Sequence, residues 1–245
     1  MDFVLDIKSS IGLEAENLVN KVFPEKTAQL DAILQSPEFR LENIPSVREK
    51  SWESHANVTA KKENSKASTS DRNIGEPPAK LLKSCDEGDA SEDAVEKQEV
   101  FSNPQIVHLL EIIRPEIITL MESCNTIRTW VMLLLPKMED GNNFGVSVQE
   151  ETMGELKGVE TETAVFLEST TSYFFARAKV ASKVIKHPKI HDYARFIAEE
   201  DEKQFVSLRH TVAELRNFYS SLHDLIMKNI DKIKKPRNSN LSSMY

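Results

Sequence analysis

Glycine is scarce in this chain, with seven residues in 245, and only 7% of the residues are aromatic. Both deficits disfavour a sheet-rich fold and favour helices. Apolar residues still make up 40% of the sequence, which is enough for a hydrophobic core. The two cysteines, Cys85 and Cys124, are too few for a disulfide framework, so both are expected to be reduced thiols.

Basic charge is also in deficit, because 31 Lys and Arg residues stand against 39 Asp and Glu residues, for a formal net charge of −8. A nucleic-acid-binding protein needs clustered cations, so this balance argues against nucleic acid as a partner. The N-terminus has acidic residues where a signal peptide needs a basic region. The most apolar run, residues 130–135, is far shorter than the roughly 20 residues that span a bilayer. We therefore expect an intracellular, soluble protein with no membrane partner.

Motifs of catalysis and metal binding are missing from the sequence. None of the six histidines has a glutamate three positions before it, so the Glu-x-x-His pairs of di-iron bundles are absent. His187 and His191 are four residues apart, but Pro188 between them argues against a shared helical face. The sequence also contains no nucleophile elbow, no phosphate-binding loop and no dinucleotide fingerprint. These absences predict no catalytic residue, no metal and no cofactor.

Four long segments repeat apolar residues at the helical spacing of three or four positions. They cover about residues 7–34, 106–134, 146–186 and 190–233. Pro24 and Pro115 lie inside the first two segments and predict a kink or a restart there. Helices of roughly 30 to 40 residues would be about 45–60 Å long, which is more than a compact monomer of this size needs. Short connections make neighbouring helices antiparallel. The predicted fold is all-α, an elongated up-and-down four-helix bundle with faces left for other subunits.

Polar residues interrupt the apolar stripes of the last two predicted helices. Thr163, Thr170 and Arg177 take stripe positions in the third helix, and Asp201 takes one in the fourth. These breaks predict that part of the third helix does not face a dry core.

The segment 36–101 differs in composition from the rest of the chain. It is rich in charged residues, Ser and Asn and has few large apolar residues, which predicts a disordered linker. The predicted organisation is helix one (1–35), the linker (36–101), helices two to four (102–235) and a flexible tail (236–245).

Two short stretches contain residues that a simple connection or chain end does not require. The stretch 136–146 holds Asp-Gly, an Asn pair and a second Gly around Phe144, which is typical of a shaped turn. Phe144 either packs back over the end of the bundle or projects toward a partner. The tail after Pro236 ends in Met244, Tyr245 and a carboxylate, which is either a frayed terminus or a peptide suited to a partner's pocket.

These residues together resemble the 11S regulators, the ATP-independent proteasome activators also called REG. The stretch LPKMEDGNNFGVSVQEET is similar to the activation loop of that family almost residue for residue, and PEIITLMESCNTIRTWV and LHDLIMKNIDKIKKPR extend the similarity over helices two and four. The forms ARAKVASKVIKHP and NIDKIKKPRNSN look most like the gamma branch, whose members are typically nuclear homoheptamers. In the linker, that branch carries a compact basic cluster where this chain has only the diffuse KKENSK.

The resemblance implies a seven-membered ring that docks on the alpha subunits of the 20S proteasome core, opens its gate and stimulates peptide hydrolysis without nucleotide. The implied activation-loop residues are Glu139, Asp140, Gly141, Asn142, Asn143, Phe144 and Gly145. The implied tail residues that enter the alpha pockets are Ser243, Met244 and Tyr245. Arg177 and Lys179 either face the channel of the ring, stay solvated or lie at an interface. The chain itself is not expected to be an enzyme.

An alternative is an intracellular helical scaffold that oligomerises without contacting proteasomes, and a metal-binding bundle enzyme is a weaker third hypothesis. The resemblance places the protein in the nucleus, the cytoplasm or both, with the nucleus favoured. The sequence leaves open the partners of residues 36–101, the substrates, the stimulated peptidase activity and whether the ring is homomeric.

Overall fold

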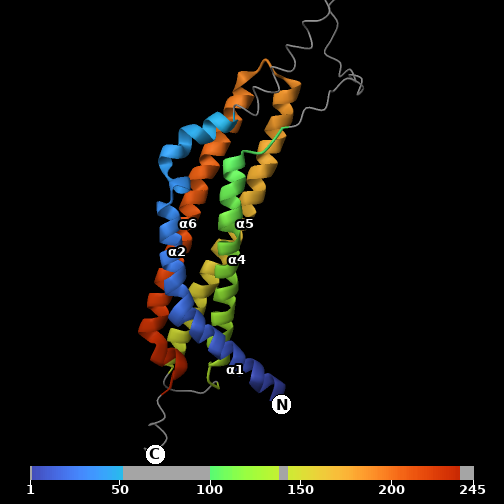
Figure 1. Cartoon of the computed structure of the whole chain (residues 1–245). Helices are drawn as coiled ribbons and strands as arrows, with labels where there is room; N and C mark the ends of the chain where they lie inside the picture. Colours follow the sequence, from blue (N-terminus) through green and yellow to red (C-terminus); the bar gives the residue numbers. More distant parts are fainter. Residues whose placement is uncertain (1, 52–99, 138–142, 238–245) are drawn as a thin grey trace, which may run out of the picture.

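The helices form one elongated bundle. The computed structural model describes residues 2–51, 100–137 and 143–237, and in these ranges the chain contains no strand. Its long helices are α1 (Asp2–Asn17), α2 (Phe23–Gln35), α4 (Pro104–Leu133), α5 (Phe144–Lys186) and α6 (His191–Lys234). In Figure 1, α2, α4, α5 and α6 run side by side, while α1 leaves the bundle obliquely next to α4. The all-α four-helix bundle predicted from the spacing of apolar residues is thereby confirmed.

The first predicted helix restarts at its proline. A π-helical turn, η1 (Leu18–Val22), joins α1 to α2, and Pro24 stands in the first turn of α2. Proline has no N–H for the carbonyl four residues earlier and its ring crowds that group, so a widened turn just before it relieves the clash. In contrast, α4 continues as one helix through Pro115.

The core lies along the axis of the bundle. Its largest enclosed side chains come from α2, α4, α5 and α6 and include Phe39, which follows α2. The rings of Phe23 and Tyr219 meet edge to face with 5.0 Å between their centroids. Burying a large aliphatic or aromatic side chain stabilises the fold by about 1.5–3 kcal/mol. The apolar stripes that predicted the helices are therefore also what holds them together.

The predicted linker begins too early. Residues 36–51 form two short 3-10 turns, η2 (Pro37–Phe39) and η3 (Leu41–Asn43), followed by helix over 44–51. Phe39 and Val47 are fully buried, and Arg209 on α6 donates hydrogen bonds to the carbonyls of Leu34 (3.0 Å) and Phe39 (2.8 Å). The prediction was wrong here because these few apolar residues all pack on the bundle, although the average composition is polar. Residues 52–99 of the predicted linker lie outside the described residues.

The polar breaks in α5 are also buried rather than solvated. The hydroxyls of Thr163 and Thr170 donate to the helix's own carbonyls at Val159 (2.9 Å) and Leu167 (2.8 Å). A threonine that is satisfied in this way can face a packed neighbour without leaving an unpaired donor. The expectation that this face avoids the dry core is therefore corrected.

Arg177, a candidate for the channel lining, lies inside the subunit instead. It is 4% exposed, and its Nε lies 2.9 Å from Oδ1 of Asp201, which is fully buried. Tyr173 donates to the same oxygen (2.8 Å), and Asn103 (3.0 Å) and Ser51 donate to Oδ2. A buried carboxylate needs a cation and several donors, and this set supplies them. We call these five residues the Asp201 cluster.

The Asp201 cluster joins parts of the chain that are distant in sequence. Ser51 precedes the segment 52–99, whereas Asn103, the N-cap of α4, follows it, and the guanidinium of Arg177 also donates to the carbonyl of Phe101 (3.0 Å). Burial, followed by the nearby charge of Asp201, raises the pKa of the Tyr173 hydroxyl. That hydroxyl therefore stays protonated and acts as a donor to the carboxylate.

None of the helices in the described part of the chain is long and apolar enough to cross a membrane. Within residues 2–51, 100–137 and 143–237, no group of three His, Cys, Asp or Glu side chains is arranged to hold a metal ion.

Candidate functional site

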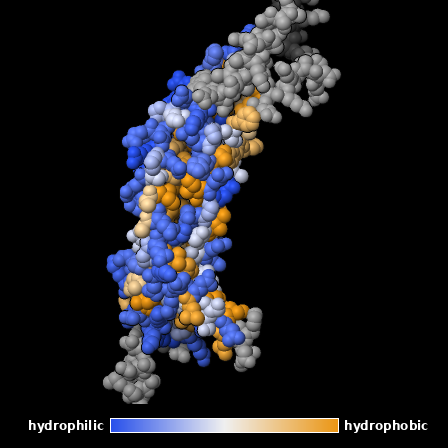
Figure 2. Space-filling model, viewed as in Figure 1, coloured by the Kyte–Doolittle hydropathy of each residue, from blue (hydrophilic) through white to orange (hydrophobic). Residues whose placement is uncertain are grey.

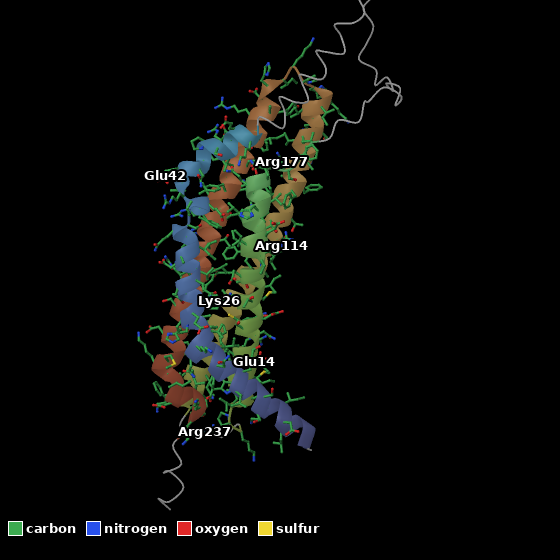
Figure 3. All side chains as sticks on the ribbon, in the orientation of Figure 1. Glu14, Lys26, Glu42, Arg114, Arg177 and Arg237 are labelled. Carbon is green, nitrogen blue, oxygen red and sulfur yellow. The ribbon has the colours of Figure 1, made fainter. Side chains whose placement is uncertain are left out.

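The two stretches that stood out in the sequence meet at one end of the bundle. Lys137, Asn143 and Gly145 belong to the predicted activation loop, and they lie beside Pro236 and Arg237, which follow the last turn of α6. Figure 3 shows Arg237 at the opposite end of the bundle from Arg177. We call residues 135–137, 143–149 and 232–237 the loop end. The residues Glu139, Asp140, Gly141 and Asn142 of the predicted loop lie outside the described residues.

Phe144 is presented to solvent at this end. It is the first residue of α5 and its side chain is 68% exposed, so it does not pack back over the bundle. The ammonium of Lys232, in the last turn of α6, lies 5.9 Å from the centre of its ring, within the range of a weak cation–π contact. The structure also shortens the predicted loop, because Phe144, Gly145 and Val146 already form the first turn of α5.

Gly145 allows the backbones of α5 and the tail root to touch. A Cβ at position 145 would lie 2.0 Å from the carbonyl oxygen of Pro236 and 2.6 Å from its carbonyl carbon and Cα. Real Cβ contacts are not that short, so only glycine fits this position without moving the backbone. The predicted loop therefore ends in direct contact with the beginning of the predicted tail.

Gln149 connects the start of α5 to the ends of α4 and α6, a role that the sequence analysis did not predict. It is fully buried in the first turns of α5, and its amide nitrogen donates to the carbonyl of Ile233 on α6 (2.8 Å) and, at 3.4 Å, to that of Leu134 after α4. Carbonyls at helix C-termini lack helical partners, so a buried side-chain amide is well suited to satisfy them. A polar residue in the middle of VSVQEET was the available signal.

Arg237 holds both sides of the loop, and sequence reasoning missed it as well. One terminal nitrogen of its guanidinium donates to the carbonyl of Lys137 (2.9 Å), and the other donates to the side-chain oxygen of Asn143 (3.1 Å). The planar guanidinium presents several donors in a fixed fork, which suits two acceptors on different segments. The tail residues Ser243, Met244 and Tyr245 lie outside the described residues.

Lys179 is exposed on α5, so its predicted position in the channel stays a prediction. Cys124 is enclosed in α4, and burial together with the nearby Glu160 carboxylate raises the pKa of its thiol to about 12. A thiol that stays protonated is a poor nucleophile. The residue is thus part of the core and not a reactive group.

Both ends of the predicted loop, the exposed ring of Phe144 and the root of the tail thus lie together at one end of the bundle, an arrangement suited to a protein that docks on a partner. Family models identify which one. The C-terminal model of proteasome activator PA28 matches residues 99–243, and its N-terminal model matches residues 2–50. The chain therefore belongs to the proteasome activator PA28 family.

Relatives cover the chain almost completely. It is 39% identical to proteasome activator complex subunit 3 of Homo sapiens over 257 residues, which is 97% of this chain and 93% of the relative. It is 31% identical to proteasome activator complex subunit 2 of Bos taurus, over 95% of this chain and 89% of the relative. The resemblance to 11S regulators that the loop motif indicated is confirmed.

Solved structures agree in fold. The 11S subunit PA28 of the Plasmodium falciparum proteasome superposes with a TM-score of 0.68 at 27% identity, covering 97% of this chain and 94% of that one. The trypanosome activator PA26, solved in complex with the yeast 20S proteasome, gives a TM-score of 0.56 at 15% identity over 98% of both chains. The second likeness concerns the fold alone.

Proposed function

We propose that this protein is an ATP-independent activator of the 20S proteasome core, which docks by its tails and opens the gate with the loop at residues 136–146. The observation that carries the proposal is the convergence of that loop and the tail root at one end of the bundle. Family membership supports the activator over the oligomeric scaffold without proteasome activity. The family is one of regulators, so the peptide bonds are cleaved by the partner and not by this chain.

In this mechanism the tail supplies affinity. Residues Ser243, Met244 and Tyr245 with the terminal carboxylate enter a pocket between alpha subunits of the core, where an apolar side chain and a carboxylate find complementary groups. One short peptide binds weakly. A ring that carries one tail per subunit raises the overall affinity by a factor of about 10²–10⁴, because each later docking step is intramolecular.

The loop supplies activation. Asp140, Asn142 and Phe144, with their neighbours in the loop, press on the turns of the alpha ring that hold the gate. A contact shifts an equilibrium only if it is stronger in one state than in the other, and moving it from 1:99 to 99:1 takes about 5.5 kcal/mol of difference. A loop with fixed ends is suited to this task because it favours the gate position that fits it.

The ring is a homoheptamer in this proposal. A single subunit leaves large apolar side chains in water, among them Leu13 (71% exposed), Val165 (57%) and Phe175 (73%), and such groups are typical of surfaces that neighbours cover. Figure 2 shows hydrophobic side chains reaching the visible face along the bundle. Cyclic closure repeats one pair of different patches around the axis. Lys179 is a candidate for the inner wall of the channel, and residence in the nucleus, the cytoplasm or both is supported by the gamma-branch resemblance.

Hydrolysis of a fluorogenic peptide by a latent 20S core particle without ATP tests the proposal. The purified protein is expected to stimulate hydrolysis, and deletion of Met244-Tyr245 is expected to abolish stimulation while light scattering still shows the ring. An Asn142→Ala ring should bind the core but stimulate less, because it keeps the tails and weakens the loop contact. A well-formed wild-type ring that gives no stimulation of a core particle from the same organism would refute the activator function.

A further inference from the structure

Arg237 occupies a position that the roles of loop and tail leave unexplained. It is the last described residue before the tail and eight residues from the C-terminal Tyr245. Its guanidinium reaches the carbonyl of Lys137 and the side chain of Asn143, which flank the loop residues 138–142. One side chain at the tail root thus bridges both sides of the loop.

The backbone that carries Arg237 is itself fixed. Pro236 rests against Gly145 at a distance that admits no side chain, and the carbonyl of Ile233 accepts from the buried amide of Gln149. These two contacts join the end of α6, and the residues that follow it, to the first two turns of α5. The backbone of Arg237 is therefore held in place, and its hydrogen bonds to Lys137 and Asn143 connect it to both sides of the loop.

The same geometry links the tail to the loop. Eight residues beyond Arg237 reach at most about 26–29 Å when fully extended. Arg237 therefore stands where a docked tail would join the bundle, and it is also the residue that contacts both sides of the loop. A binding site can lose its activity when its residues are held about 1 Å too loosely, even though all of them are present. The residues that hold the loop therefore matter as much as the loop residues themselves.

We propose that Arg237 is a positioning residue that holds the two sides of the activation loop in a fixed place beside the root of the tail. This inference rests on the proposed function. Its role is to hold Lys137 and Asn143 at a fixed separation, so that a docked ring presents the loop in one position. Without it the ring still docks, but the loop loses its preference for the open gate.

The test measures binding and stimulation separately, using intact rings of Arg237→Met and Arg237→Lys. The methionine retains an apolar stem and removes all donors, whereas the ammonium of lysine can restore one of the two hydrogen bonds. The concentration of Arg237→Met ring that gives half-maximal stimulation should be within about threefold of the wild-type value. The stimulation at saturating ring should be at least fivefold lower than that of the wild type. Arg237→Lys should recover part of that loss.

A pair of insertions provides a matched control. A Gly-Ser pair placed after Arg237 lengthens the tail and leaves the clamp in position, so stimulation should stay within twofold of the wild type. The same pair placed between Pro236 and Arg237 lengthens the tail equally but moves the guanidinium, and it should reproduce the loss seen with Arg237→Met. This comparison also serves if Arg237→Met fails to assemble.

The outcomes separate the two proposals. Stimulation by saturating Arg237→Met within twofold of the wild type would overturn the positioning role while the activator function stands. A tenfold rise in the half-maximal concentration with unchanged maximal stimulation would overturn it too, because Arg237 would then act in docking. No stimulation by the wild-type ring in the same plate would refute the proposed function and this inference with it.

Discussion

Replacement of Gly145 by alanine tests the contact between the loop and the tail root most directly. The added Cβ would lie 2.0 Å from the carbonyl oxygen of Pro236, where ordinary contacts begin at 3.4 Å. The two backbones must therefore separate by about 1.4 Å, since dispersion contacts become repulsive below their optimum of roughly 3.5–4.0 Å. The nearest atoms belong to backbone, so no side chain can rotate away to make room.

The expected result follows from this overlap. Overpacking of a close contact costs typically about 1–3 kcal/mol of stability. The separation also moves the beginning of α5 away from Pro236, so the distance between the loop and the root of the tail increases. We expect Gly145→Ala rings to unfold at lower denaturant concentration and to stimulate a latent 20S core at least fivefold less at saturation.

Two other glycines of α5 provide the control. A Cβ at Gly154 or Gly158 would meet nothing within 4 Å in the subunit, and alanine in a helix interior is favoured over glycine by about 1 kcal/mol. Gly154→Ala and Gly158→Ala should therefore keep or raise stability and leave stimulation unchanged. Equilibrium unfolding at fixed protein concentration and the fluorogenic assay measure both effects. Equal behaviour of Gly145→Ala and Gly154→Ala would refute the reasoning.

Three further predictions concern the interior of the bundle. Asp201→Asn leaves the buried guanidinium without its anion and should lower the free energy of unfolding by about 3–5 kcal/mol, whereas Asp224→Asn at an exposed ion pair should change it by less than about 1 kcal/mol in a denaturant titration. Phe39→Ala should cost about 3–5 kcal/mol in the same titration, and a change below about 1 kcal/mol would contradict the packing of residues 36–51. In a Cys85→Ser background, Cys124 should resist thiol reagents at pH 8 until the protein unfolds. Prompt labelling of the native ring would contradict the burial of this thiol. Between pH 9 and about 12 only the unfolded thiol ionises, so the contribution of Cys124 to the free energy of unfolding should fall by up to about 1.4 kcal/mol per pH unit as the pH rises.

The helices were predictable because their stabilising contacts repeat. The expected third segment, 146–186, corresponds to α5, and the expected fourth, 190–233, differs from α6 by one residue at each end. A stripe of Leu, Ile, Val and Phe at helical spacing encodes both the helix and the face that it buries. The loop motif identified the family for a related reason, since a shaped turn needs particular residues in a particular order.

The buried polar contacts were not predictable from one helix at a time. Arg177 broke the stripe of α5 and Asp201 broke that of α6, and each was interpreted within its own segment. Both residues lie twelve positions from Lys189, which stands in the turn between these antiparallel helices. Opposite charges at equal distances from a tight turn were the signal for the pair. Arg237 gave no such signal, because Lys137 and Asn143, which accept its hydrogen bonds, lie about a hundred residues away in the sequence.

The Asp201 cluster has a consequence for how much the length of this chain can vary. Ser51 and Asn103 bind the same carboxylate, so the two ends of the intervening segment meet at one point of the bundle. The entropy of closing a loop grows only logarithmically, and doubling its length costs about 0.6 kcal/mol. The two family models end and resume at this point, at residues 50 and 99. Insertions and deletions between them should therefore change the free energy of unfolding little, and they leave the contacts at the loop end untouched.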